Sequence, residues 1–592
     1  MANVMVLQAL DYLIVAVVAL VFVGIGFYFA CLGKKQRTTR EYFLGDRNVN
    51  VIPIVMSIMA SFISSNAMLG IPAEVYYFGF NYFWITLGAF IGGPIAIYGF
   101  MPVFHKLAFT SIFQYIECRF NKNLSVCIGM VDVFNLLVFA SFSTYTPALA
   151  LSQVTGLTIW TAVLSTTVIG TIYTSIGGIK AVVLTDALQL LIFIGALMAV
   201  IINSGTSVGS FSYVFSKNIE GHRLDMLSFS ADPRIRYTFW GFMAYSVVDV
   251  LTLYGVNQIT LQRYLCCRNK KTAQRIIWIS LIGHGIIIAV FCFIGLILYA
   301  MYWNCDPLAS QQIQKPDQLF PLFVMQTMSS IPGMLGLFVS AVFCAALSTI
   351  SSVLNSLAAI TIEGLLKPRC KSLSDNKAAL ISKFIAAAYG IICLLMIAVI
   401  MNLGNVIQAG RYVIGGTIGA YLGLFVLGLM NPWANSKGSF LGMVCGLAMG
   451  WWISIGNQIH KPPPNSLLPI PTLNCTDILG DDWTPQSKPH QSAMDILEIY
   501  KISYLWVSSI AFTVTVIIGS VSSLLIARID KDSNKNVDMK LLSPFVHSVM
   551  KKCFPNKYKE LVLQCKEEIG VELTNKTEKL KKTQKSIELV AD

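Results

Sequence analysis

The chain has 592 residues, of which 55% are apolar and only 12% are charged. Soluble domains carry about 25% charged residues, so this composition excludes an ordinary soluble protein and predicts a polytopic membrane protein. The formal net charge of +13 gathers in short linkers between apolar segments, so we attribute it to membrane topology and not to nucleic-acid binding.

About thirteen segments are long and apolar enough to cross roughly 30 Å of hydrocarbon as helices. They lie near residues 10–32, 51–78, 82–104, 124–148, 154–175, 182–204, 238–260, 275–301, 320–363, 378–401, 405–430, 437–457 and 503–527. The ninth is longer than one span requires, so we expect a surface stretch before its spanning part. The expected fold class is an all-α polytopic membrane protein.

Basic residues mark alternate linkers, namely those after the first, seventh and ninth segments. They are Lys34, Lys35, Arg37, Arg40 and Arg47, then Arg263, Arg268, Lys270, Lys271 and Arg275, then Lys367, Arg369, Lys371 and Lys377. Cytoplasmic loops carry an excess of Lys and Arg, so these linkers should face the cytoplasm. An odd number of helices then places the N-terminus outside and the C-terminus inside. The first segment lacks a basic n-region, so we expect a retained helix.

The predicted outer loops hold two cysteines and one sequon. Cys305 and Cys475 either form a disulfide or remain free thiols. Asn474, in the long loop 458–502, is the sequon that we expect to be glycosylated. The charged tail from about residue 528 is predicted to be cytoplasmic, with a short helix and disorder.

Two segments carry small and polar residues where a lipid-facing helix would be apolar. The first runs from Ser61 to Asn66 and then reaches Gly70-Ile71-Pro72, and the second runs from Tyr254 to Gln258. They are five spans apart, and interrupted segments at matching positions of two halves are typical of inverted-repeat transporters. The competing interpretation is that such residues are common in packed membrane helices.

A run of hydroxyl residues lies inside the apolar segment 335–362 and consists of Ser348, Thr349, Ser351 and Ser352. Hydroxyls in hydrocarbon need partners, so the run either joins helices or supplies ligands for a small cation. A broken helix would free the carbonyls of Ala60 and Ile63. With the carbonyl of Ala345 and the first two hydroxyls of the run, these make five neutral oxygens. Such a set suits a monovalent ion of sodium's size.

A second polar pair, Asp186 and Gln189, shares one helix face at a spacing of i, i+3. A carboxylate inside a membrane segment is a functional candidate. Asp186 could bind a second cation or carry a proton. Alternatively, it forms a salt bridge with Lys180 near the cytoplasmic surface.

At these residues the chain resembles the sodium/solute symporter family, and in particular the branch of sodium/iodide, sodium-coupled monocarboxylate and sodium-dependent multivitamin transporters. The resemblance covers roughly residues 8–525. Its blocks include ASFISSNAMLGIPAEVYYFG at 60–79, PALALSQVTGL at 147–157, YTSIGGIKAVVLTDALQ at 173–189, YGVNQITLQRYLCCR at 254–268 and ALSTISSVLNSLAAITIEGLLKPR at 346–369.

The resemblance implies a leucine-transporter-like core of two inverted five-helix repeats and alternating access driven by the sodium gradient. The expected division is 1–50 with a first flanking helix, 51–204 as the first repeat, 205–237 as an extracellular loop, 238–430 as the second repeat, 431–527 as flanking helices, and 528–592 as the tail. By motif position, the family's shared sodium site falls on Ala60, Ile63, Ala345, Ser348 and Thr349. A second sodium site falls near Ser61, Asp186, Gln189 and Gln258.

The resemblance also bears on the solute. The iodide transporter looks to have glutamine, tryptophan and phenylalanine where Ala67, Val250 and Arg411 stand, so iodide is not favoured. Phe62, Phe139 and Tyr254 are candidate aromatic walls of the cavity, and Gln408 is a further candidate. Arg411 could grip a carboxylate bidentately, pair with Asp249, or extend to the outer surface.

The sequence therefore predicts a sodium-coupled symporter of a small, monocarboxylate-like organic anion in the plasma membrane, with electrogenic transport. Alternatives are a symporter of iodide, a vitamin or choline, or, from other classes, an ion channel or a non-transporting nutrient sensor. The expected partners are the solute, sodium ions and the lipid bilayer, with no nucleic acid and an oligomeric state that the sequence leaves open. No phosphate loop, His/Cys metal cluster or nucleophile elbow predicts an enzyme.

Overall fold

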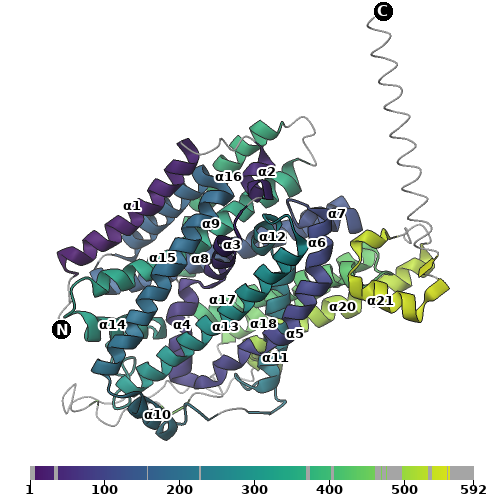
Figure 1. The fold of residues 1–592 in the computed structure, drawn as a ribbon. Coiled ribbons are helices and arrows are strands. Elements are labelled where there is room, and N and C mark those ends of the chain that lie inside the picture. The colour runs from purple at the N-terminus through teal and green to yellow at the C-terminus, as the bar shows by residue number, and fades with distance from the viewer. Residues whose placement is uncertain are drawn as a thin grey trace, which may run out of the picture.

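The computed structural model describes residues 7–31, 38–47, 49–156, 158–225, 228–367, 374–401, 406–460, 468–469, 475, 497–530, 537–556 and 558–559. These residues form helices joined by loops of varied length, and no strand occurs among them. Figure 1 shows long helices packed side by side, with α1 at one edge of the bundle and α20 and α21 at the other. The predicted all-α class is confirmed.

The number of spans agrees with the sequence. Eleven helices of the described part are long and apolar enough to cross a membrane, and α3 with α4 forms a further, bent span. The helix α9 (Ile159–Ser207) has 49 residues and a non-helical backbone at Gly178, where φ is +62°. At 1.5 Å per residue it is about 74 Å long, which is enough for the two predicted spans.

The bounds of the long helices follow the predicted segments closely. They are α1 (Ala9–Cys31), α8 (Lys122–Thr155), α13 (Lys270–Met301), α15 (Met334–Ala359), α16 (Asp375–Ile400), α17 (Val406–Met430), α18 (Ser436–His460) and α20 (Tyr504–Ile529). The third span is a chain of short pieces, η2 (Phe80–Thr86), α5 (Gly88–Pro94), η3 (Ile95–Phe100) and α6 (Met101–Leu107). A separate helix, α14 (Leu319–Met328), precedes α15, as the length of the ninth segment predicted.

Both predicted interruptions are present. The helices α3 (Val51–Phe62) and α4 (Ser65–Phe78) meet at an angle of 57°, with Ile63 and Ser64 outside helical geometry. In the seventh span, α11 (Phe239–Val250) continues as a π-helix, η4 (Leu251–Val256), and Asn257 is extended before α12 (Gln258–Leu265) begins. Non-helical backbone at membrane depth is tolerated where it lies inside protein or lines a cavity.

The centre of the bundle is α15, which is buried along nearly its whole length, whereas α1 exposes most of its residues. The main partners of α15 are α9, α8, α1 and α16, and α15 also touches α3. Small residues allow other helices to approach closely. A Cβ at Gly442 of α18, for example, would lie 2.5 Å from the carbonyl oxygen of Thr515 on α20.

Outside the bundle, a disulfide joins Cys305 to Cys475. This resolves the choice between a disulfide and two free thiols. The candidate glycosylation residue Asn474 lies outside the described residues. In the tail, the structure describes one short helix, α21 (Pro544–Cys553), which packs near α17.

Candidate functional site

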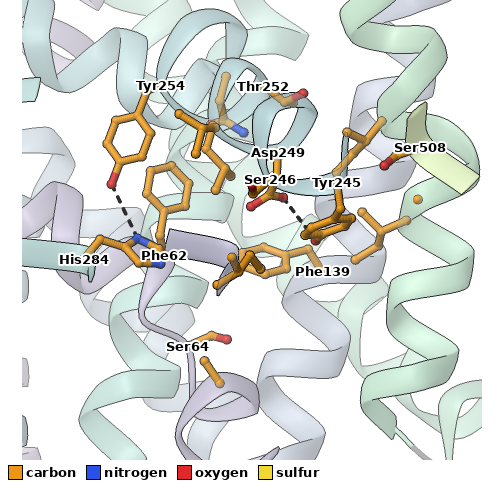
Figure 2. Close-up of a pocket in the computed structure, with 18 of the residues that line it drawn as sticks. Phe62, Ser64, Phe139, Tyr245, Ser246, Asp249, Thr252, Tyr254, His284 and Ser508 are labelled. Atoms are coloured by element: carbon orange, nitrogen blue, oxygen red, sulfur yellow. Dashed lines mark hydrogen bonds between the residues drawn. The ribbon is translucent and has the colours of Figure 1, made fainter. Parts of the chain in front are cut away.

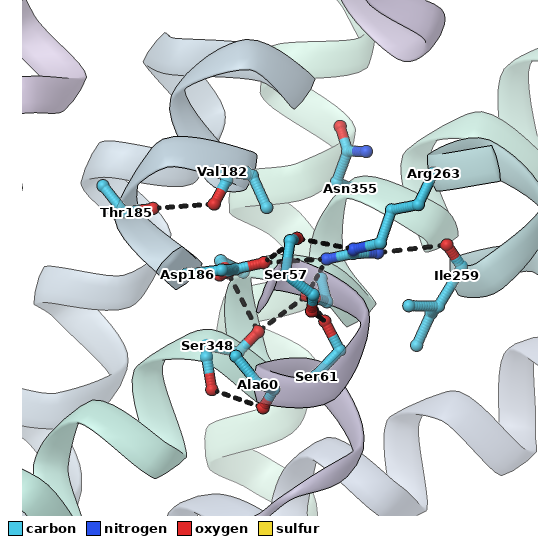
Figure 3. A network of polar contacts seen from close by, with 12 residues as sticks. Ser57, Ala60, Ser61, Val182, Thr185, Asp186, Ile259, Arg263, Ser348 and Asn355 are labelled. Atoms are coloured by element: carbon cyan, nitrogen blue, oxygen red, sulfur yellow. Dashed lines mark hydrogen bonds and ion pairs between the residues drawn. The ribbon is translucent and has the colours of Figure 1, made fainter. Parts of the chain in front are cut away.

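The first candidate sodium site lies where α3 ends against the middle of α15. The Ser348 hydroxyl donates hydrogen bonds to the carbonyl oxygens of Ala60, at 2.8 Å, and Ala345, at 3.1 Å. The Thr349 hydroxyl donates to the same Ala345 carbonyl at 3.1 Å. Figure 3 shows Ser348 facing Ala60 across the two helices. Four of the five predicted ligand residues are thus in contact.

The fifth residue, Ile63, is the first residue beyond α3. The break at this point ends the regular hydrogen bonding of α3, and the last carbonyls of a helix carry partial negative charge. These oxygens and the two α15 hydroxyls are neutral, hard ligands of the kind that sodium accepts. The same hydroxyls also bond α15 to α3, so the run joins helices, and its role as a set of cation ligands stays a prediction.

A buried charged network lies beside this site. Asp186 of α9 accepts hydrogen bonds from the Ser57 hydroxyl at 2.6 Å and from the Arg263 guanidinium at 2.9 Å. Arg263 also donates to the Ser57 hydroxyl at 2.7 Å and to the Ile259 carbonyl at 3.0 Å. The side chains of Asp186 and Arg263 are 0% and 1% exposed. The network joins α3, α9 and α12 (Figure 3).

The hydroxyl run of α15 touches both the sodium-site residues and the charged network. Ser351 donates to Asp186 at 3.3 Å, and Ser352 shares hydrogen bonds with Arg263 and with Ser61, the latter at 2.8 Å. Successive turns of one helix therefore contact the end of α3 and the Asp186–Arg263 pair. A movement of α15 would change the contacts at both places.

A cavity of about 240 Å³ lies against the α3–α4 break, with Phe62 and Ser64 in its wall. Five of the seven candidate solute residues line it: Phe62, Ala67, Phe139, Val250 and Tyr254. The side chains of the other two, Gln408 and Arg411, lie outside the described part, although their helix α17 contributes Gly410 and Ile414 to the wall. The cavity is thus built from both interrupted spans, α8 and α17.

Aromatic rings form much of the cavity wall. The rings of Phe62 and Tyr254 lie 5.9 Å apart, and the Tyr254 hydroxyl is 3.4 Å from Nδ1 of His284. Figure 2 shows this group on one side of the cavity, with Phe139, Tyr245 and Asp249 on the other. Such walls suit a small organic solute that has an apolar part.

An ion pair borders the cavity on its predicted outer side. The carboxylate of Glu74, which lines the cavity, lies 2.7 Å from the Arg236 guanidinium and accepts a hydrogen bond from the Tyr237 hydroxyl at 2.5 Å. The guanidinium also stacks 4.2 Å from the centre of the Phe78 ring. These residues tie α4 to the loop before α11.

Comparison with known proteins fits this geometry. A family model described as "Sodium:solute symporter family" matches residues 42–446, well over half of the chain. The chain belongs to the sodium:solute symporter family. It is therefore a multi-pass membrane protein that couples solute transport to sodium.

Several relatives agree with this assignment, and one solved structure shares the fold. The symporter is 37% identical to mouse sodium-coupled monocarboxylate transporter 1, covering 87% of this chain and 86% of that protein. It is 34% identical to the human sodium/iodide cotransporter (87% and 83% covered) and 35% identical to the rabbit sodium-dependent multivitamin transporter (87% and 82%). A substrate-bound, outward-open sodium-coupled sialic acid symporter has the same fold, with a TM-score of 0.71 at 22% identity over 88% of this chain and 98% of that one.

Two expectations about charge in the symporter are wrong. Arg263 was assigned to a cytoplasmic linker, yet it is buried within α12. The alternative salt bridge of Asp186 with Lys180 is replaced by the pair with Arg263. A buried carboxylate needs a close, well-oriented partner to offset its desolvation, and Arg263 supplies one from 77 residues along the chain.

The second candidate sodium site is only partly assembled in the symporter. Ser61 connects to the Asp186 network through Ser352, and Gln189 is buried on α9. Gln258, however, is bonded elsewhere, to the backbone of Ile112 and Thr110 at 2.9 Å each. A second sodium ion therefore stays a prediction. The sequence analysis did not identify Ser57, which lies one turn before Ser61. Arg263 could have been identified as a functional candidate, because an arginine next to an apolar segment is unusual.

Proposed function

We propose that this symporter moves a small organic solute bearing a carboxylate, together with sodium, across the plasma membrane by alternating access. On this proposal Ala60, Ile63, Ala345, Ser348 and Thr349 bind the first sodium ion. The solute occupies the aromatic cavity beside them. Movement of two sodium ions with one monovalent anion would leave a net positive charge transferred, so transport would be electrogenic.

One observation supports coupling between the proposed sodium ion and the solute. Ala60, whose carbonyl bonds Ser348, and Phe62, which lines the cavity, are two residues apart at the break between α3 and α4. A ligand at either place contacts the same few residues of non-regular backbone. Binding of sodium would therefore help to hold the break in the form that the solute needs, which is the differential interaction that coupling requires.

The carboxylate part of the proposal has two supports. Two of the relatives are named as monocarboxylate and multivitamin transporters. In addition, Arg411 follows Gly410 and precedes Ile414, both of which line the cavity from α17. A guanidinium at this level of the helix could hold a carboxylate through two parallel hydrogen bonds.

The orientation and the repeats are part of the same proposal. The alternate basic linkers favour an extracellular N-terminus and a cytoplasmic C-terminus. The interrupted spans, five spans apart, support inverted repeats at 51–204 and 238–430. On this orientation the Glu74–Arg236 pair lies at the extracellular end of the cavity.

Voltage-clamp recording of expressing cells tests the proposal. We expect lactate, nicotinate or biotin to evoke an inward current that disappears when sodium is replaced by an inert cation. Iodide, choline and glucose should evoke little current. Current with iodide or choline alone would overturn the carboxylate assignment and retain sodium coupling. For solutes that evoke no current, tracer uptake measured with and without sodium decides whether transport is electroneutral or absent.

A further inference from the structure

The described wall of the cavity holds more acidic groups than a simple anion site needs. Three carboxylates line it, from Glu74, Asp132 and Asp249, and no lysine or arginine is among its described lining residues. Glu74 is neutralised by Arg236. Asp132 and Asp249 have no ion pair within the described part of the chain. A buried carboxylate without an ion pair either takes up a proton or binds a cation, so the two aspartates are candidate ligands for a positively charged group.

A neighbouring polar group points to what the two aspartates bind. Asn135 lies three residues after Asp132 on α8, so the two side chains share a helix face. Asn135 is 8% exposed, and its buried Oδ1 has no hydrogen-bond partner among the described residues. Buried polar atoms are normally satisfied. A hydrogen-bond acceptor without a partner, next to a carboxylate, suits a ligand with N–H donors.

The environment of Asp249 fits the same ligand. Its carboxylate accepts one long hydrogen bond, 3.3 Å, from the Tyr245 hydroxyl, which leaves acceptor capacity on both oxygens. The aromatic residues Phe139 and Tyr245 lie near it in Figure 2. Aromatic faces attract cations, so the wall around Asp249 favours a positive group as well as an apolar one.

The charged groups of the cavity wall favour some classes of solute over others. Asp132 and Asp249 have no ion pair among the described residues, and a plain carboxylate offers neither of them a positive group. A solute with an ammonium group as well as a carboxylate does offer one, and so leaves less charge uncompensated. Buried charges persist where they are paired, so the charged groups favour a zwitterion.

We infer that the solute is an amino carboxylate, whose protonated amine binds at one of the two carboxylates without an ion pair, either Asp249 beside its aromatic neighbours or Asp132 beside Asn135. This rests on the proposed function, because it uses the same cavity and the same carboxylate. It goes beyond the monocarboxylate prediction by assigning a second, positively charged group to the preferred solute.

The test compares solutes that differ only in the amine: butyrate with 4-aminobutyrate, and propionate with alanine. In cells expressing the full chain, we measure sodium-dependent tracer uptake and current. We expect at least one amino carboxylate to act at tenfold or more lower concentration than its deaminated partner. In at least one of Asp249→Asn and Asp132→Asn this preference should fall at least tenfold, while half-activation by sodium stays within about twofold. Asp225→Asn, in an exposed loop, should behave as the unaltered protein.

Each outcome bears on the inference. Equal or better transport of the deaminated acids would overturn it and leave the proposed function standing. An amine preference that survives both aspartate variants would overturn the assignment to this cavity. No sodium-dependent transport of either class would contradict the proposed function itself. Sodium-induced thermal stabilisation of the purified variants shows that each is folded, so a loss of preference is not a loss of structure.

Discussion

Replacement of Arg263 by methionine is expected to destabilise the folded protein by about 3–5 kcal/mol, because it leaves the buried carboxylate of Asp186 without its partner. The pair is almost completely buried and is held by Ser57 from a third helix. The change should appear as a large drop in the melting temperature of the detergent-purified protein and in the amount delivered to the cell surface.

Two further variants make this prediction specific. Arg268, five residues later, is exposed, so Arg268→Met should melt close to the unaltered protein. The double variant Asp186→Asn/Arg263→Gln removes both charges and should recover most of the lost stability, since neutral partners cost less to bury. If Arg263→Met melted like Arg268→Met, the buried pair would not contribute to the fold.

Replacement of Ser348 by alanine should raise the sodium concentration that half-activates transport by about tenfold, which corresponds to about 1.4 kcal/mol. The reason is that a hydroxyl which bonds the carbonyls of Ala60 and Ala345 would no longer complete the oxygen set. At saturating sodium, the apparent solute affinity should change by no more than about twofold. Sodium titration of solute uptake measures both values.

Thr349→Ala should shift sodium activation in the same direction, because its hydroxyl bonds the same carbonyl of Ala345. Ser382→Ala is a matched control, since Ser382 is buried on α16 and its hydroxyl bonds the Ala378 carbonyl of its own helix. Unchanged sodium activation in both Ser348→Ala and Thr349→Ala would refute the ligand assignment.

The helices and their interruptions could be predicted from the sequence because each leaves a local pattern of residues. Long apolar runs predicted the spans, and the polar stretches from Ser61 to Asn66 and from Tyr254 to Gln258 predicted the breaks that the structure shows. The contacts of Ser348 with the carbonyls of Ala60 and Ala345 were also predictable, since a hydroxyl cluster inside hydrocarbon must find oxygen partners or ligands; sodium binding there stays a prediction.

The charged network of Asp186 and Arg263 could not be predicted from the sequence in the same way. Asp186 and Arg263 are 77 residues apart, and the sequence offered nearby Lys180 as an equally reasonable partner. Arg263 also lies close in sequence to a basic linker, so nothing local indicated that its side chain is buried. Asp132 attracted no attention because nothing local shows that α8 turns it toward the same cavity as Asp249. Pairings of this kind depend on tertiary packing.

As a sodium-coupled symporter, this chain uses a sodium gradient to concentrate its solute. At 100 mV and a tenfold gradient, one sodium ion supplies about 3.7 kcal/mol, enough to concentrate a neutral or zwitterionic solute several hundredfold. The most direct test is purified protein in liposomes with an inward sodium gradient and labelled 4-aminobutyrate, butyrate or nicotinate. The account predicts transient accumulation of at least one of them above equilibrium, abolished by a sodium ionophore. Uptake that only reaches equilibrium, with or without the gradient, would contradict it.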